Sequence, residues 1–224
     1  YTENGDSISW PEGAYSTDLY TDKLIQYINL AVAEDKPFFS YAAYTTPHWP
    51  LQVDEEYWKK YEGRYDDGYE VLRLKRFNKM KELGFLPQGE MLPDLHSRVI
   101  PWDSLTAEEQ RFESRKMELY AGMVDNMDAN IGRLMNHLKK IGQFEITVIL
   151  FLSDNGAAAE DFYHHRYFGP FLQEHYTEEY SHMGSEESFI SYGPQWAEAG
   201  ASPFKYFKGY TTQGGINTPL VISG

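Results

Sequence analysis

Ile146-Thr-Val-Ile-Leu-Phe-Leu-Ser-Asp-Asn-Gly156 is the stretch of sequence that decides the predicted fold. Residues 146–152 are apolar apart from Thr147, and four of these seven residues are β-branched. A short apolar run that ends abruptly in polar residues and a glycine predicts a strand buried on both faces, as in parallel α/β sheets. We therefore expect an α/β fold with a mixed, largely parallel, doubly wound sheet flanked by helices.

Asp154 and Asn155 stand where this predicted strand ends. Ligands of open α/β sheets bind at the carboxyl ends of the strands. A carboxylate beside an amide offers two hard oxygen donors, which suits a divalent cation, and Gly156 allows the chain to turn away. The sequence therefore predicts that Asp154 and Asn155 are metal ligands.

The other elements alternate in the order that α/β winding requires. Apolar residues recur at spacings of three and four along residues 16–33, which predicts a helix. Thr106 and Glu109 form a capping box that opens the strongest helix signal, which runs to about residue 141. The remaining predictions are short helices over 54–61 and 67–83 and strands over 38–44 and 219–223.

Composition excludes several classes of function. The 224 residues carry a formal net charge of −14, which argues against binding to nucleic acid or to an anionic membrane. An anionic substrate would need a locally positive pocket. The absence of cysteine excludes disulfides and thiolate metal sites, and no apolar run approaches the length of a membrane span.

His48 and Lys208 are the candidate groups for proton transfer and anion binding. His48 lies between two prolines at the end of the strand predicted over 38–44, and Lys208 precedes a Gly214-Gly215 pair that indicates a tight turn or a close backbone approach. Each has an ordinary alternative, because His48 could simply pack against Trp49 and Lys208 could be a surface lysine. Together with Asp154 and Asn155 they suit transfer of a sulfuryl or phosphoryl group.

Residues 157–201 show no clear period, and a loop of this length is usually functional or disordered. The loop contains four histidines whose irregular spacing fits no standard zinc pattern: His164, His165, His175 and His182. Asp125 and Asp128 fall on the long predicted helix, far from any strand end, and are interpreted as structural.

Four segments, in order, resemble the sulfatase family of the alkaline-phosphatase superfamily, in its bacterial arylsulfatase branch. They cover residues 36–52, 117–133, 148–156 and 207–219, and Lys208 stands six residues before the glycine pair, as in family members. The resemblance implies that Asp154 and Asn155 hold calcium, that His48 contacts the sulfate ester and protonates the leaving oxygen, and that Lys208 binds a sulfate oxygen. Residues 188–196 resemble a substrate-side loop.

The chain departs from the family pattern in what it lacks. The family nucleophile is a formylglycine made from the Cys or Ser of a Cys/Ser-x-Pro-x-Arg motif, and no such motif occurs here. The paired N-terminal aspartates of the calcium site are also missing. We therefore expect residues 1–224 to be the central and C-terminal part of a catalytic domain, without its N-terminal part and small C-terminal domain, and inactive alone.

The function implied for the parent protein is hydrolysis of small-molecule sulfate esters with calcium and formylglycine. Two alternatives stay open. One is a phosphonate monoester or phosphodiester hydrolase of the same superfamily, and the other is a non-catalytic fragment or pseudo-enzyme. The sequence leaves the organic half of the substrate and the oligomeric state undecided, and it favours a periplasmic or secreted location over the cytoplasm.

Overall fold

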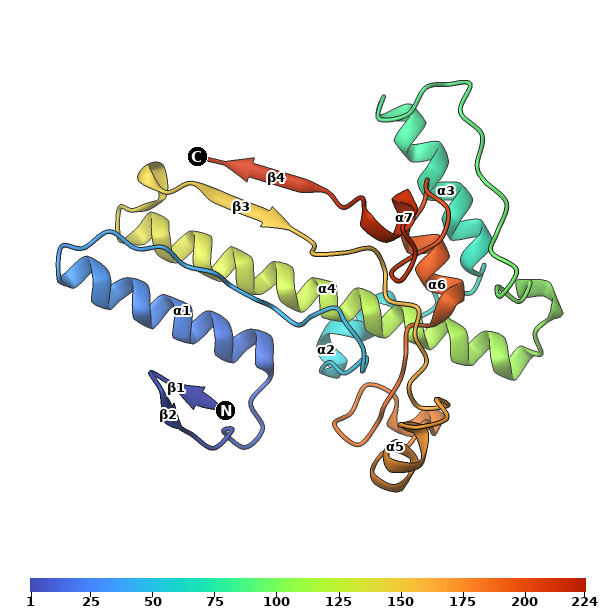
Figure 1. Ribbon diagram of the computed structural model, residues 1–224, viewed down its shortest axis with the longest axis horizontal. Coiled ribbons are helices and arrows are strands. Elements are labelled where there is room, and N and C mark those ends of the chain that lie inside the picture. The colour runs from blue at the N-terminus through green and yellow to red at the C-terminus, as the bar shows by residue number, and fades with distance from the viewer. The chain divides into compact units, whose positions relative to one another are not determined.

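The computed structural model describes all residues 1–224, and they form two compact units. The first unit consists of Tyr1–Thr46 and Asp125–Thr147, and the second of Pro47–Val124 and Val148–Gly224. The long helix α4 (Ala107–Lys140) contributes to both units (Figure 1). None of the helices is both long and apolar enough to span a membrane.

Helix α4 confirms the strongest prediction from the sequence. Its N-terminus has the expected capping box: a Glu109 carboxylate oxygen accepts bonds from the backbone N–H (2.7 Å) and the hydroxyl (2.8 Å) of Thr106. Its C-terminus is followed by Gly142, whose φ of 72° lies in the left-handed region that ends helices. Local capping chemistry therefore fixes both ends.

The first unit pairs α1 (Ser16–Ala33) with the C-terminal part of α4, beside a small hairpin of β1 (Thr2–Glu3) and β2 (Asp6–Ser7). Asp18 on α1 accepts a 2.6 Å bond from the amide of buried Asn130. The strand predicted over residues 38–44 is wrong for this structure, since that stretch is irregular and Phe39 is 95% exposed. Aromatic residues favour a pleated, half-buried surface, and no neighbouring strand pairs with this segment.

The second unit holds the aromatic core around α3 (Tyr69–Glu82) and α6 (Gly193–Gly200), which pack together. Trp196 on α6 is fully buried, and its ring meets that of Tyr69 edge-on at 5.4 Å. The indole N–H of Trp196 donates to the carbonyl of Glu113 at 3.0 Å. Aromatic packing with a satisfied indole thus fixes α6.

The remaining elements of the second unit are short. They are α2 (Glu55–Trp58), the 3-10 turns Lys59–Tyr61, Trp102–Ser104 and Tyr180–His182, α5 (Gly169–His175) and α7 (Gln213–Ile216). A further 3-10 turn, Phe144–Ile146, belongs to the first unit. The sequence analysis did not predict α5 and α6, which lie in the region without a clear period, or α7, which contains the glycine pair.

The strand predicted from residue 146 is shorter and more exposed than expected. It begins after the 3-10 turn as β3 (Ile149–Leu152) and pairs antiparallel with β4 (Leu220–Ser223), with Leu150 opposite Ile222 (Figure 1). Leu150 is 57% exposed and Ile222 62% exposed, so burial on both faces is wrong for this chain. A single neighbouring strand cannot cover either face. The largely parallel, doubly wound sheet is not seen among these strands.

A buried ion pair joins α3 to α6 within the second unit. Arg73 and Glu198 approach to 3.8 Å, Glu198 is fully buried, and neither of its carboxylate oxygens has a hydrogen-bond partner. Burial raises the pKa of the Glu198 carboxyl above its usual value of 4.5, and the Arg73 charge opposes this rise. Burying two charges costs desolvation energy, so the pair by itself is weak evidence for stability.

The exposed apolar pair β3–β4 predicts that the 224-residue chain self-associates, because unpaired apolar strands recruit partners. A double change of Leu150→Lys with Ile222→Glu should keep a favourable cross-strand pair and abolish the association. Light scattering measures the self-association. The control is Phe85→Lys, in an exposed loop, which should leave the self-association unchanged. A clean monomer of the unaltered chain at high concentration would contradict the prediction.

Glu198 predicts a specific pH dependence of stability. Because its folded-state pKa is raised, its contribution to stability is fully present below about pH 4.5 and is lost as the pH rises through the folded-state pKa. The free energy of unfolding should therefore fall with pH in that window, by up to about 1.4 kcal/mol for each pH unit, relative to Glu198→Gln. Denaturant titrations of both proteins from pH 4 to 8 measure the difference; parallel curves would refute it.

Candidate active site

His48 and Lys208, 160 residues apart in sequence, lie in direct contact in the second unit. The Lys208 Nζ atom is 3.2 Å from His48 Nε2, and His48 Nδ1 is 2.9 Å from the carbonyl oxygen of Trp49. A carbonyl only accepts, so Nδ1 carries the proton and Nε2 accepts from the ammonium group. The ring of Trp49 also packs on the imidazole at 4.5 Å. His48 is thus held in one orientation with Nε2 toward the cation.

Lys208 is positioned by its own backbone. Its N–H donates to the carbonyl of Ala157 at 3.0 Å, which ties the lysine to the segment that follows Asp154 and Asn155. Tyr206, two residues before Lys208, has a φ of 68°, an uncommon conformation for a residue with a side chain. Tyr206 stacks on Tyr210 at 4.7 Å, so ring packing supports this turn.

The glycine pair marks a close backbone approach, one of the two arrangements predicted from the sequence. A Cβ atom on Gly214 would lie 2.0 Å from the carbonyl oxygen of Tyr206, and one on Gly156 would lie 1.9 Å from the carbonyl oxygen of Gly214. The N–H of Gly156 donates to the carbonyl of Gly215 at 2.9 Å. Only glycine fits at this crossing, which joins the segment after β3 to the segment that carries Lys208.

Asp154 and Asn155 follow β3 as predicted and leave their side-chain oxygens free. Neither side chain makes a hydrogen bond or an ion pair, and Asp154 is exposed. Their backbone is fixed, since the hydroxyl of Thr218 donates to the carbonyl of Ser153 at 2.8 Å. Two adjacent side-chain oxygens without hydrogen-bond partners could serve as part of a calcium site, which needs six to eight oxygens.

Glu160 is a site residue that the sequence did not single out. Its Oε1 atom lies 4.0 Å from Lys208 Nζ, and its Oε2 atom is buried without a hydrogen-bond partner. The sequence offered one indication of Glu160, an acidic residue six positions after Asp154. The stretch around it has no recognisable period, so this indication could not be placed on a helix or a strand.

Parts of the segment from residue 157 to 192 pack against the residues that follow His48. Phe162 and Phe189 both pack against the ring of Trp49, at centroid distances of 4.8 and 5.8 Å. The N–H of Leu51 donates to the carbonyl of Ile190 at 2.9 Å. The substrate-side loop suggested for residues 188–196 thus begins beside the His48 segment.

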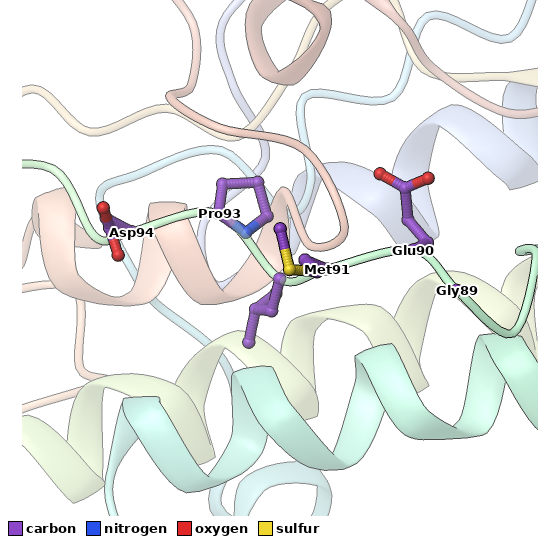
Figure 2. A pocket seen from close by; sticks show the side chains of 6 residues that line it. Gly89, Glu90, Met91, Pro93 and Asp94 are labelled. Carbon is purple, nitrogen blue, oxygen red and sulfur yellow. The ribbon is translucent and has the colours of Figure 1, made fainter.

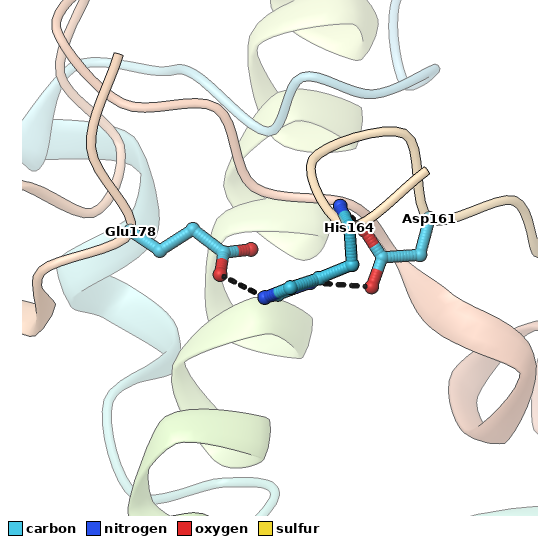
Figure 3. Close-up of side chains that lie close together, drawn as sticks. All are labelled: Asp161, His164 and Glu178. Atoms are coloured by element: carbon cyan, nitrogen blue, oxygen red, sulfur yellow. Dashed lines mark hydrogen bonds and ion pairs between the residues drawn. The ribbon is translucent and has the colours of Figure 1, made fainter. Parts of the chain in front are cut away.

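The four histidines of this region do not gather into one site. His164 and His182 each lie between two carboxylates. Around His164, Asp161 is 2.9 Å from Nδ1 and Glu178 is 3.3 Å from Nε2 (Figure 3). Burial raises the pKa of the Glu178 carboxyl, whereas the His164 charge lowers it. The imidazole of His164 thus bridges two carboxylates, and we interpret this cluster as a link between two loop segments.

A shallow surface hollow lies elsewhere, along residues 89–94 (Figure 2). It contains none of the residues predicted to act in catalysis. Its lining is one continuous loop with two carboxylates, Glu90 and Asp94, and no cation that would hold an oxyanion. The hollow therefore does not coincide with the site predicted around Lys208.

Comparison with known proteins places the whole chain in one group. The sulfatase family model matches residues 1–224. The chain is 38% identical over 226 residues to an arylsulfatase of Klebsiella aerogenes, and 37% identical over 236 residues to an uncharacterized sulfatase of Schizosaccharomyces pombe. These alignments cover 100% and 99% of the chain but 48% and 41% of the relatives. The chain therefore spans about half the length of the curated relatives it matches.

Two solved structures share the fold of the chain. One is the putative sulfatase yidJ from Bacteroides fragilis, with a TM-score of 0.55, 17% identity, and coverage of 98% of this chain and 33% of that one. The other is Ps i-CgsB in complex with k-i-k-neocarrahexaose, with a TM-score of 0.52, 22% identity, and coverage of 98% and 30%. These likenesses support an α/β fold of the alkaline-phosphatase kind.

The backbone crossing predicts that Gly156→Ala destabilises the protein and displaces the Asp154 turn. The added methyl group cannot fit 1.9 Å from a carbonyl oxygen, so the free energy of unfolding should fall by about 1–3 kcal/mol. Gly132→Ala is the matched control, since it lies within α4 with open space around it and should stabilise by about 0.5–1 kcal/mol. Denaturant unfolding measures both, and an unchanged stability of Gly156→Ala would contradict the crossing.

Proposed function

Residues 1–224 belong to the sulfatase family, and we propose that the full-length protein containing them hydrolyses sulfate esters, with an arylsulfatase-like site. The observation that carries this proposal is the contact between His48 Nε2 and Lys208 Nζ at 3.2 Å. It joins a proton-carrying group to a fixed positive charge on the loop that is bonded to Ala157, three residues after Asp154. A proton donor and a fixed cation are two of the groups that transfer of a sulfuryl group uses.

Lys208 would bind an equatorial oxygen of the sulfate group and neutralise part of its charge. When the ester enters, its bridging oxygen would take the place of the ammonium group as the partner of His48 Nε2. His48, protonated in that complex, would give its proton to the departing oxygen as the S–O bond breaks. The Nδ1 bond to the carbonyl of Trp49 would keep the ring oriented during this transfer.

Two components of the reaction come from outside these residues or from solution. A formylglycine hydrate, formed from a Cys or Ser in a segment not included here, would supply the nucleophile. Asp154 and Asn155 would hold calcium together with further ligands, and the ion would supply Lewis-acid stabilisation of the sulfate oxygens. Residues 1–224 alone contain neither the nucleophile motif nor a full ligand set, so the activity is proposed for the full-length protein.

A hydrolase of phosphodiesters or phosphonate monoesters is the second candidate. The same groups would serve it, since its substrates also present a singly charged tetrahedral centre. The names of the relatives favour the sulfatase, because the arylsulfatase of Klebsiella aerogenes aligns over the whole chain. A non-catalytic role would follow if the full-length protein lacks the Cys/Ser-x-Pro-x-Arg motif.

The proposal predicts calcium-dependent turnover of 4-nitrophenyl sulfate by full-length protein in which mass spectrometry confirms formylglycine. Lys208→Ala and His48→Asn should each lower kcat/KM by about 10²–10⁴. The loss in His48→Asn should be greater for phenyl sulfate than for 4-nitrophenyl sulfate, because the poorer leaving group needs the proton more. A chelator should abolish turnover and calcium should restore it.

Two matched variants control for general damage. Lys205→Ala removes a lysine from the same segment, and His175→Asn removes an exposed histidine on α5, so both should keep near-normal turnover. Hydrolysis of bis(4-nitrophenyl) phosphate without any sulfate ester turnover would replace the sulfatase assignment with the second candidate. Absence of both activities in formylglycine-containing protein would leave the non-catalytic role.

A further inference from the structure

Glu160 places a negative charge beside the cation that would hold the substrate. Lys208 Nζ lies 3.2 Å from His48 Nε2 and 4.0 Å from Glu160 Oε1. The proposed reaction requires a positive charge here and gives no task to a carboxylate. Its presence therefore needs a separate explanation.

The carboxylate is held near Lys208 by anchors on both sides of it in sequence. Three residues earlier, the carbonyl of Ala157 accepts the backbone N–H of Lys208 at 3.0 Å. Two residues later, Phe162 packs on Trp49 at 4.8 Å, and Trp49 packs on His48 at 4.5 Å. The loop cannot carry Glu160 away without breaking one of these contacts.

No other group within residues 1–224 neutralises this carboxylate. Its Oε2 atom is buried and makes no hydrogen bond, and Lys208 is its one ion-pair partner. The side chain is only 37% exposed, so water screens its charge incompletely. An anion bound at Lys208 would therefore feel both the attraction of the ammonium group and the repulsion of Glu160.

That repulsion grows with the charge of the bound anion. A sulfate monoester carries one negative charge, whereas inorganic sulfate carries two and a phosphate monoester about two near neutral pH. One additional charge about 6 Å from the carboxylate, at an effective dielectric of about 40, changes affinity about tenfold. A lysine paired with a carboxylate thus discriminates by charge as well as by shape.

We propose that Glu160 is a specificity-determining residue that makes the Lys208 site select singly charged tetrahedral oxyanions and reject doubly charged ones. This deepens the proposed function and rests on it. Sulfate monoesters would be admitted, and phosphate monoesters would be disfavoured. The sulfate dianion released at the end of the reaction would be repelled, which favours product departure.

The test compares two small anions of the same geometry in the full-length protein with saturating calcium. Methanesulfonate carries one charge and cannot be hydrolysed, and inorganic sulfate carries two. Calorimetric titration gives both dissociation constants for the unaltered protein, Glu160→Gln and Glu160→Ala. Asp161→Asn is the matched control, because it removes the same charge one residue further on, from a carboxylate already bonded to His164.

We expect Glu160→Gln to tighten sulfate binding about tenfold more than methanesulfonate binding. Glu160→Ala should do the same, and Asp161→Asn should change the ratio of the two constants less than twofold. Added salt should weaken the effect. The unaltered protein could bind sulfate too weakly to measure. In that case, measurable sulfate binding by Glu160→Gln supports the proposal, and no measurable binding by either protein overturns it.

We call the proposed selection of singly charged anions by Glu160 the charge filter. Different results would refute the charge filter and the proposed sulfatase reaction. An unchanged ratio in folded Glu160→Gln and Glu160→Ala, with intact turnover of 4-nitrophenyl sulfate, refutes the filter and leaves the sulfatase. A shifted ratio in a protein that hydrolyses no sulfate ester keeps the filter and refutes the sulfatase. A ratio that shifts equally in Asp161→Asn would show a general charge effect and would also refute the filter.

Discussion

The candidate site depends on one backbone crossing, where Gly156 and Gly214 approach too closely for any side chain. A Cβ atom on Gly156 would lie 1.9 Å from the Gly214 carbonyl oxygen, and the Gly156 N–H bonds to the next carbonyl at 2.9 Å. The turn with two oxygen donors stands on one side of the crossing, and the lysine loop stands on the other. The predicted metal ligands and the predicted anion-binding lysine are thus coupled through main-chain atoms, which move less than side chains do.

The parts of the fold that the sequence predicted are those set by local chemistry. Helix α4 was predicted to within one residue at its end, because its capping box, its apolar stripe and Gly142 all act within a few residues. The strand over residues 38–44 failed for the opposite reason. Strand formation needs a partner, and aromatic content alone does not supply one. Likewise the C-terminal end of β3 was predicted correctly, but its start and its burial were not. Burial depends on what lies on either side of a strand.

The site shows the same division. Asp154 and Asn155 could be found from the abrupt end of an apolar run, and Lys208 from its distance to a glycine pair. The contact of Lys208 with His48 could be expected only through the family resemblance, because 160 residues separate them. Neither the sequence pattern nor the family resemblance singled out Glu160. Its importance comes from a distance across two loops, and the sequence around it has no period from which that distance could be inferred.

Lys208 lies between His48 and the carboxylate of Glu160. Under our proposal, the carboxylate would let a site in an acidic chain bind an anion without retaining it. The 224 residues carry a net charge of −14, so the long-range field repels every anion. Binding then requires a short-range attraction strong enough for one negative charge. If Lys208 acted without Glu160, the same attraction would hold the doubly charged product more tightly than the substrate. A carboxylate 4.0 Å from the ammonium group offsets this excess where it arises, while leaving the lysine in place for the singly charged ester.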